Sequence, residues 1–414
     1  MQLLVSFFFL MLFMPQVFQG PRAVLLLLVL LTTYKQYIPV HLSKEIKFYW
    51  NITYFVAIYS FFIGLLRGNL GALPCAKFYL VWPVLFLYFF IRCYKIDSIK
   101  VLLRTVVYGG LIVAAFNFIL IANAFILHIG ILDAIGTALG CLFNIQEGFA
   151  EYFSPSGNHL AYVLFFCVSL LLLKPETLGV KKKYLYICIL LCVIDILLSN
   201  RRAMWLTVGM LPILLLAIFA ILPYNKIVIL RIGAITIISG LVIIGFLYNF
   251  LDPESVTTEL LSSFDFSGDE GSNNERILQG RSLWNDFKNW PILGGGMGLV
   301  STYVRTPEGP WAYELTYNYS LASVGLVGFI IYTISTCWIF KKSINLSKKS
   351  IEYASLLIPQ ILGLAAVLII SASNPYIGTF DVVWVIYLPV ATINAIWYEQ
   401  RETKKNLSLS ESRA

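Results

Sequence analysis

Long runs of apolar residues alternate with short polar connections along almost the whole chain. A helix needs about 20 apolar residues to cross the hydrocarbon core of a bilayer, and about twelve runs come near that length. The pattern therefore predicts an all-α, polytopic transmembrane helix bundle. The first run lacks the basic residues of a secretory signal, so we expect it to remain as an uncleaved helix. The expected spans are residues 3–18, 23–40, 47–66, 76–91, 101–128, 158–173, 184–198, 203–222, 226–250, 315–340, 351–370 and 381–398.

The segment 252–314 is the only long polar interruption of this pattern. Ser272 and Glu275 have the spacing of a capping box, and Pro291 is a helix breaker, so a short helix is expected between them. Arg276 and Arg281 lie about 140° apart around such a helix, so only one of them should face a site. The sequence thus divides into nine spans (1–250), a partly helical loop (251–314), three spans (315–398) and a tail (399–414).

Composition agrees with a membrane protein. Hydrophobic residues make up 59% of the 414, charged residues 13%, and the mean hydropathy is +0.79, whereas a soluble domain carries about 25% charge. The net charge of +8 comes from short basic clusters between the apolar runs, a pattern typical of cytoplasmic anchoring loops and not of nucleic-acid binding. The seven cysteines form no CxxC pair, so neither a zinc site nor a disulfide framework is indicated.

The basic residues also predict an orientation. With both termini in the cytoplasm, all but nine of the 30 Lys and Arg residues fall on the cytoplasmic side, as the positive-inside rule requires. The polar loop is then extracytoplasmic. Arg201 and Arg202 stand against this bias at an outer helix end. They either snorkel to lipid headgroups or capture an anion at the membrane surface.

Two further features of the loop have alternative interpretations. The glycine run 294–298 is either a flexible turn or a cradle whose N–H groups bind phosphate, although its spacing matches no nucleotide-binding motif. Glu314 ends the loop among Trp311, Tyr313 and Tyr317. It is either a solvated carboxylate in an aromatic belt or a general base close to phosphate-binding arginines.

Four local patterns give the chain a resemblance to a known family. They are SPSGNHLAY before the sixth span, SNRRAMW between the seventh and eighth, QGRSLWNDFKNWPILGGGMG in the loop, and LTYNYSLASVGLVGF at the start of the tenth. In this order, with the large loop after the ninth span, they resemble the bacterial O-antigen ligase and Wzy-type O-antigen or capsule repeat-unit polymerase superfamily. The resemblance covers most of the chain and implies a GT-C-like membrane glycosyltransferase.

The resemblance also implies roles for individual residues. Arg202, with its neighbour Arg201, and Arg281 would bind the pyrophosphate of a polyprenyl-linked donor, and Arg276 would matter less. Glu314 stands where ligases of the family have a histidine base, and none of His41, His128 and His159 can fill that position. This departure favours a polymerase, with Glu314 as the base. His159, Tyr313 and Tyr317 are expected to line the substrate site or to support it structurally.

The function expected from these patterns is polymerisation of undecaprenyl-pyrophosphate-linked oligosaccharide repeat units at the periplasmic face of the bacterial inner membrane. No metal and no cofactor is expected. The donor and acceptor lipids, the bilayer, and the chain-length regulator and flippase of the same pathway are the expected partners. Transfer of polysaccharide to the lipid A core by a ligase is the first alternative. Transport of lipid-linked oligosaccharide is the second, with Asp195 in the seventh span as its candidate residue.

Overall fold

The fold is known from a computed structural model, which describes residues 2–13, 24–28, 31, 41–91, 93–146, 149–199, 201–223, 272–379 and 381–411. Most of the expected second span, the whole ninth span and the first part of the polar loop lie outside these residues. The elements in chain order are α1 Gln2–Phe13, α3 Lys44–Leu66, α4 Ala72–Ala76, η1 Lys77–Val81, α5 Trp82–Ile91, α6 Ile96–Ala122, η2 Asn123–Leu127, α7 Gly130–Ala138, β1 Leu142–Gln146, β2 Phe149–Phe153, η3 Pro155–His159, α8 Leu160–Leu172, η4 Pro175–Leu178, α9 Lys182–Leu198, α10 Arg202–Ile221, α13 Ser272–Asn289, α14 Thr316–Ser347, α15 Ile351–Ile370 and α16 Trp384–Glu411.

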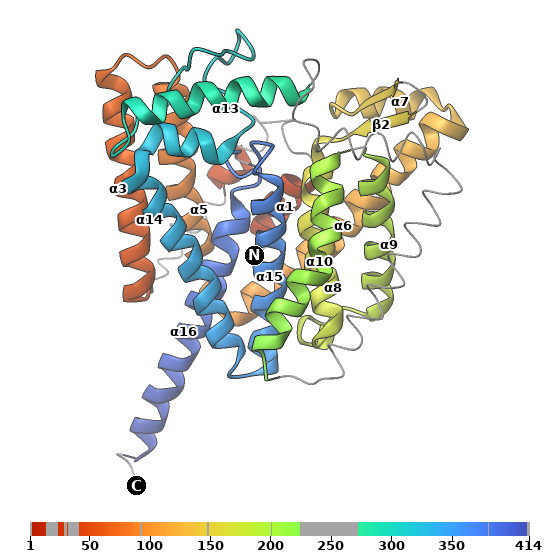
Figure 1. Ribbon diagram of the computed structural model, residues 1–414. Coiled ribbons are helices and arrows are strands. Elements are labelled where there is room, and N and C mark those ends of the chain that lie inside the picture. Colours follow the sequence, from red (N-terminus) through yellow and green to blue (C-terminus); the bar gives the residue numbers. More distant parts are fainter. Residues whose placement is uncertain are drawn as a thin grey trace.

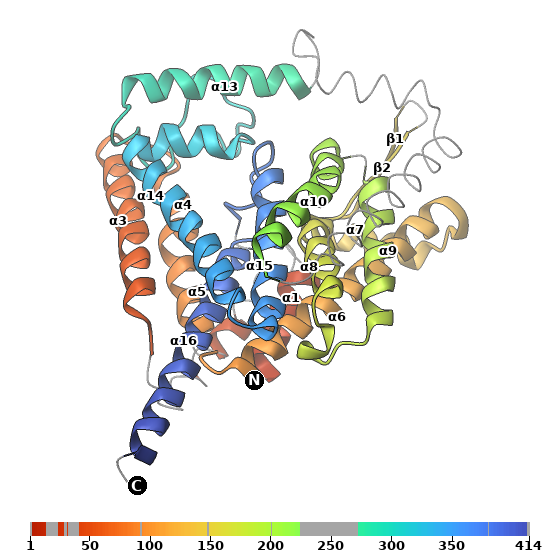
Figure 2. The same ribbon diagram turned by 60° about the horizontal axis from the view of Figure 1, so that its bottom comes forward.

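The helices form a bundle, with α13 lying across one end and α16 extending beyond the other (Figures 1 and 2). Within the described residues, six helices are long and apolar enough to cross a membrane: Lys44–Leu66, Ile96–Ala122, Pro155–Leu172, Ala203–Ile221, Thr316–Ser347 and Ile351–Ile370. The expected all-α membrane fold is confirmed at this level. The number of about twelve spans remains a prediction. One antiparallel hairpin, β1–β2, is an addition that the apolar pattern did not predict.

The centre of the bundle is formed by α8, which is almost wholly buried, and α15, most of whose residues are buried. Gly363 allows this close approach, because a Cβ at that position would lie 2.6 Å from ring atoms of Tyr162. The Tyr162 ring in turn meets Trp384 of α16 edge-on, with the ring centroids 4.7 Å apart. Small residues at contacts between helices are typical of membrane bundles, because the hydrophobic effect does not drive helices together in lipid and close van der Waals packing does so instead.

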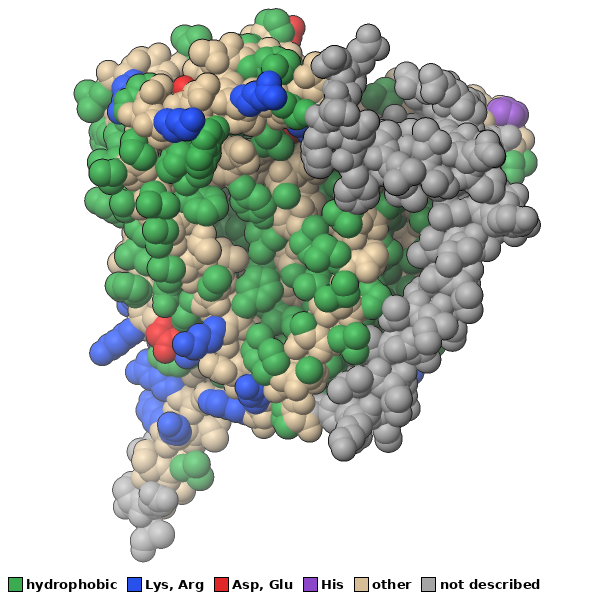
Figure 3. Space-filling model, in the orientation of Figure 1, with side chains coloured by type: hydrophobic (Ala, Val, Ile, Leu, Met, Phe, Trp, Pro, Cys, Tyr) green, Lys and Arg blue, Asp and Glu red, His purple; other side chains and the backbone are tan. Residues whose placement is uncertain are grey.

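Connections that the sequence assigns to the same side of the membrane contact one another. At the C-terminal end of the bundle, Lys342 pairs with Glu45 at 2.7 Å, and the ring of His41 lies 5.1 Å from that of Tyr398. The connections of the opposite set meet at the α13 end. Between the two ends the visible surface is mainly hydrophobic, with the basic side chains gathered at the ends (Figure 3).

One expected span is broken. Gly325 interrupts α14 with φ 67° and ψ −175°, so the first turns of α14 lie beneath α13 before the helix turns into the bundle (Figure 2). Glycine is the residue that adopts a positive φ without steric cost. The break places the start of α14, and Glu314 just before it, against α13.

Candidate functional site

The α13 helix is fixed to the loop that follows it. Gln279, Ser282 and Leu283 are the residues it buries, and the two polar ones hold backbone groups of the returning chain. Ser282 Oγ accepts a hydrogen bond of 3.0 Å from the N–H of Tyr303, and Gln279 Oε1 accepts one of 3.0 Å from the N–H of Glu314. Glu314 is therefore held in place through its own backbone.

The glycine run joins α13 to the bundle. The N–H groups of Gly295 and Gly296 donate to the carbonyls of Ala322 and Ser323 at 2.7 and 2.9 Å, and that of Met297 donates to Ser60 at 2.8 Å. Because these N–H groups are used within the protein, the run does not form the phosphate cradle considered above. It is a fixed connector between α3 and α14, and not a flexible turn.

The glycines of this connector are required by its shape. Gly294, Gly296 and Gly298 all have a positive φ. A Cβ at Gly298 would lie 1.9 Å from the carbonyl carbon of Gly71, far inside any allowed contact. The guanidinium of Arg67 closes the connector by donating to the carbonyl of Gly294 at 3.0 Å.

Glu314 is the centre of an ion-pair cluster. Arg276 Nε lies 3.1 Å from Glu314 Oε2, and Arg305 Nη1 lies 2.8 Å from Glu314 Oε1. Arg305 also reaches Glu275, with 3.6 Å between Nε and Oε2. The Glu314 side chain is 12% exposed, against 29% for Arg276 and 40% for Arg305. A carboxylate and two cations thus meet at the edge of the bundle.

Arg201 belongs to the same region. Its Nη1 donates a hydrogen bond to the hydroxyl of Tyr376, in the connection between α15 and α16. Burial raises the pKa of Tyr376, whereas the charge of Arg201 lowers it and the charge of Glu314 raises it. Thr316 Oγ1, two residues after Glu314, donates a hydrogen bond of 3.3 Å to the carbonyl of Asn374 in the same connection. The α13 loop, the start of α10 and the α15–α16 connection converge on one site.

The two loop arginines are placed differently from the expectation based on the resemblance. Arg276, for which the resemblance implies the lesser role, contacts Glu314, whereas Arg281 is exposed on another face of α13. Arg202 is the first residue of α10, and its side chain lies outside the described residues. His159 is buried, its ring centroid 6.0 Å from that of Trp384, and it does not line the cavities described below.

The two tyrosines that flank Glu314 have separate environments. Tyr313 is buried, accepts a hydrogen bond of 2.6 Å from the N–H of Ser301, and stacks on Tyr319. Tyr313 is therefore part of the loop's small core. Tyr317 lines a large cavity in the bundle, so of the two it is the one placed to contact a ligand.

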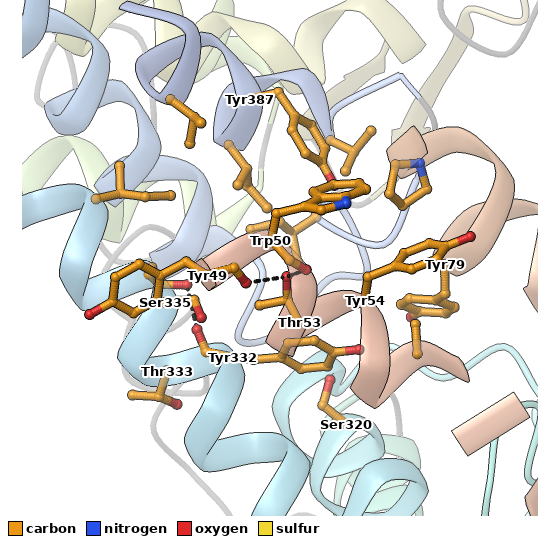
Figure 4. Close-up of a pocket in the computed structure, with 18 of the residues that line it drawn as sticks. Tyr49, Trp50, Thr53, Tyr54, Tyr79, Ser320, Tyr332, Thr333, Ser335 and Tyr387 are labelled. Carbon is orange, nitrogen blue, oxygen red and sulfur yellow. Dashed lines mark hydrogen bonds between the residues drawn. The ribbon is translucent and has the colours of Figure 1, made fainter. Parts of the chain in front are cut away.

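That cavity is an apolar groove of about 510 Å³ between α3, α5, α14 and α16. It begins at Thr316, Tyr317 and Thr379, next to the Glu314 cluster, and continues to Ile46 and Phe340 near the opposite end. Figure 4 shows tyrosine and tryptophan side chains of α3, α14 and α16 around it. We call it the tyrosine groove.

A second, small cavity of about 10 Å³ lies beside Arg201. Asn117, Asn158 and Asp195 also line it. Asp195 is buried, and neither of its carboxylate oxygens has a hydrogen-bond partner among the described residues. The volume is about that needed for one water molecule.

Three residues of the site were missed by reasoning from the sequence. Arg305 lies in an irregular loop segment, Tyr376 in a short connection, and Gln279 within α13. None has a spacing that relates it to Glu314. The chain matches no protein-family model, and no curated protein matches it.

Proposed function

We propose that the protein is a membrane glycosyltransferase that polymerises undecaprenyl-pyrophosphate-linked oligosaccharide repeat units at the periplasmic face of the inner membrane. In this proposal both termini are cytoplasmic, and the α13 end of the bundle faces the periplasm. The four sequence patterns support the family, and the observation that carries the proposal is geometric. A carboxylate flanked by two arginines precedes Thr316 and Tyr317, which line one end of an apolar groove between the helices.

The two parts of this arrangement match the two parts of a polyprenyl-linked donor. Arginine recognises phosphate oxygens through directed, charge-assisted hydrogen bonds. An apolar groove at membrane depth suits a prenyl chain, which gains contact with protein without exposure to water. The site would then hold the pyrophosphate at Arg276 and Arg305, with Arg201 nearby, and the prenyl chain in the tyrosine groove.

The chemistry follows from these groups. A hydroxyl of the acceptor sugar attacks the anomeric carbon of the donor, so a C–O bond to the acceptor forms while the C–O bond to the pyrophosphate breaks. Glu314 takes the proton of the attacking hydroxyl. The arginines stabilise the charge that develops on the departing polyprenyl pyrophosphate.

The experiment that tests this function uses the purified protein in proteoliposomes with lipid-linked repeat units as the only substrate. Wild-type protein is expected to give a ladder of longer lipid-linked saccharides and free polyprenyl pyrophosphate, and Glu314→Gln to give neither. Glu308→Gln is the matched control, because it removes an exposed carboxylate of the same loop. Polymer of normal yield from Glu314→Gln would refute the role of the base. Transfer only to added lipid A core would identify a ligase.

Transport is the second candidate function, because Asp195 is a buried carboxylate without a described hydrogen-bond partner in α9, the expected seventh span. Ionisable residues within spans commonly mark transport pathways. Lipid-linked units that cross the bilayer unchanged in the same proteoliposomes would support transport and contradict polymerisation.

A further inference from the structure

The carboxylate of Glu314 is held as an anionic ligand would be held. Each of its oxygens meets a different arginine, Arg276 on one side at 3.1 Å and Arg305 on the other at 2.8 Å. The same pair of guanidinium groups, at the same separation, can contact two oxygens of a phosphate group. The protein's own carboxylate therefore occupies a two-arginine anion site.

The arginines are more accessible than the carboxylate between them. The Glu314 side chain is 12% exposed, whereas those of Arg276 and Arg305 are 29% and 40% exposed. An anion from solvent can reach both cations without first displacing the helix that carries Arg276. Arg305 has a second carboxylate within reach, since its Nε lies 3.6 Å from Glu275 Oε2, so it has an alternative partner when it releases Glu314.

We propose that Arg276 and Arg305 form a diphosphate-binding site that Glu314 fills in the free protein, and that an incoming diphosphate takes over the two arginines and releases the Glu314 carboxylate. Only one step of this inference rests on the proposed function, namely that the released carboxylate then acts as the base. The exchange itself concerns binding. It assigns Arg305, which no sequence pattern indicated, to direct contact with the ligand.

The exchange orders the events at the site. While the diphosphate is absent, both oxygens of Glu314 are engaged in ion pairs, so the carboxylate is not available to accept a proton from a sugar hydroxyl. Once the diphosphate holds the arginines, the carboxylate is free and lies beside the bound donor. The base is then active only when a donor is present.

The test measures binding of inorganic pyrophosphate to the full-length protein in detergent by calorimetry. If the anions exchange in this way, Glu314→Gln should bind pyrophosphate at least about tenfold more tightly than wild type, because the competing carboxylate is gone. A tenfold change in Kd corresponds to about 1.4 kcal/mol of binding free energy. Arg305→Gln is expected to bind at least about tenfold more weakly. Glu275→Gln, which removes the alternative partner of Arg305 from an exposed position, is expected to give a smaller gain than Glu314→Gln.

Glu308→Gln is the control for a general electrostatic effect, since it removes one negative charge from the same loop without an ion pair among the described residues. The exchange is overturned if Glu314→Gln and Glu308→Gln change the affinity equally, or if Glu314→Gln binds no tighter than wild type while its melting temperature is unchanged. Should Glu314→Gln unfold, equal affinities of Glu275→Gln and Glu308→Gln overturn it as well.

The source of the diphosphate is resolved by comparing polyprenyl pyrophosphate with inorganic pyrophosphate. Tighter binding of the lipid by wild type, with the same gain on Glu314→Gln, supports a lipid-linked ligand. Equal binding of both supports a free diphosphate at the same site. Because affinity and polymer formation are measured separately, a protein that shows exchange but makes no polymer contradicts the proposed function alone, and one that makes polymer without exchange contradicts only this inference.

Discussion

Arg276 Nε lies 3.1 Å from Glu314 Oε2, so a residue near the start of α13 is joined to the residue just before α14. Arg281, further along α13, is exposed and has no ion pair with a described residue. The geometry therefore favours Arg276 over Arg281 as the phosphate-binding arginine of α13, whereas the family resemblance favours Arg281.

These two expectations are separated by a pair of matched substitutions. Arg276→Gln is expected to lower the rate of polymer formation at least about a hundredfold, because it removes a charge that meets the reacting groups. Arg281→Gln is expected to change it by less than about threefold, as is common for an exposed side chain. Rates would be measured in proteoliposomes. The reverse order of the two variants would support the assignment made from the resemblance.

Tyr376→Phe removes the hydroxyl that accepts a hydrogen bond from Arg201. A hydrogen bond to a charged group contributes about 1.5–3 kcal/mol, so we expect donor binding to weaken roughly tenfold while the catalytic constant changes little. Steady-state kinetics with varied donor concentration would show this as a raised KM. An unchanged KM would mean that Tyr376 does not position Arg201 for the donor. Tyr353→Phe is the control, because it removes a hydroxyl that is hydrogen-bonded to Glu399 and does not line the groove.

The tyrosine groove can be blocked from within. Ser320 lines it (Figure 4), about one turn of α14 after Thr316 and Tyr317. Ser320→Trp is expected to fill this end of the groove and raise the KM for a long-chain donor at least about tenfold, because apolar contacts of several methylene groups are lost. A donor analogue with a short prenyl chain should be affected much less. Ser320→Ala serves as the control, and equal effects on both donors would show that the chain lies elsewhere.

Gly298→Ala should destabilise the loop connector. The new Cβ would meet the backbone of Gly71 and Ala72 at 1.9–2.1 Å, at a positive φ that alanine avoids. We expect a loss of about 2–4 kcal/mol, seen as a lower melting temperature and as proteolysis within the loop. Gly309→Ala is the control, since its nearest neighbour would be at an ordinary 3.5 Å. Equal melting temperatures of the two variants would contradict the packing described for Gly298.

The pH dependence of loop stability is expected to depend on Asp286. Partial burial raises the pKa of this carboxyl, although a hydrogen bond from Ser301 acts in the opposite direction. The folded state then holds the proton more tightly than the unfolded chain. The contribution to stability is greatest below the ordinary aspartate pKa and is lost as the pH rises through the raised value.

Asp286→Asn should therefore leave stability almost unchanged relative to wild type at about pH 3, below the ordinary aspartate pKa, and increase it at pH 7.5. Melting curves of both proteins at the two pH values would measure the difference. A variant that is less stable than wild type at pH 7.5 would show that the ionised carboxylate is favourable in the fold.

The helices were predictable from the sequence, because uninterrupted apolar runs leave few alternatives in a membrane. The runs 351–370 and 203–222 correspond closely to α15 and α10. The end of α13 was also predictable, since the helix stops at Asn289 and Pro291 follows it. Residues within or next to each helix determine where it begins or ends, so these positions can be predicted without knowing what the helix packs against.

The buried face of α13 is only partly apolar. Leu283 is buried, but so are Gln279 and Ser282, whereas Trp284 is exposed. Gln279 and Ser282 accept hydrogen bonds from N–H groups of the loop beneath them, and buried N–H groups need such acceptors. The apolar pattern alone therefore does not identify these two polar side chains as buried.

The contacts of Glu314 depend on long-range folding. Helical geometry predicted that Arg276 and Arg281 diverge, but not which of them meets Glu314, because that depends on the turn of the chain at Gly325. Arg305 and Tyr376 lie in irregular segments without periodicity, so nothing in the sequence relates them to the site. The shape of the glycine run likewise follows from its contacts with α3 and α14.

The connector formed by residues 294–298 has a mechanical consequence for the groove. It is hydrogen-bonded to both α3 and α14, and these two helices also line the tyrosine groove. Separating them at the α13 end would break these backbone hydrogen bonds. At the opposite end the Glu45–Lys342 ion pair and the stacked rings of Tyr49 and Trp338 join the same two helices. The spacing of α3 and α14 is therefore set at both ends of the groove, so a bound chain would have to fit the width between these two fixed points.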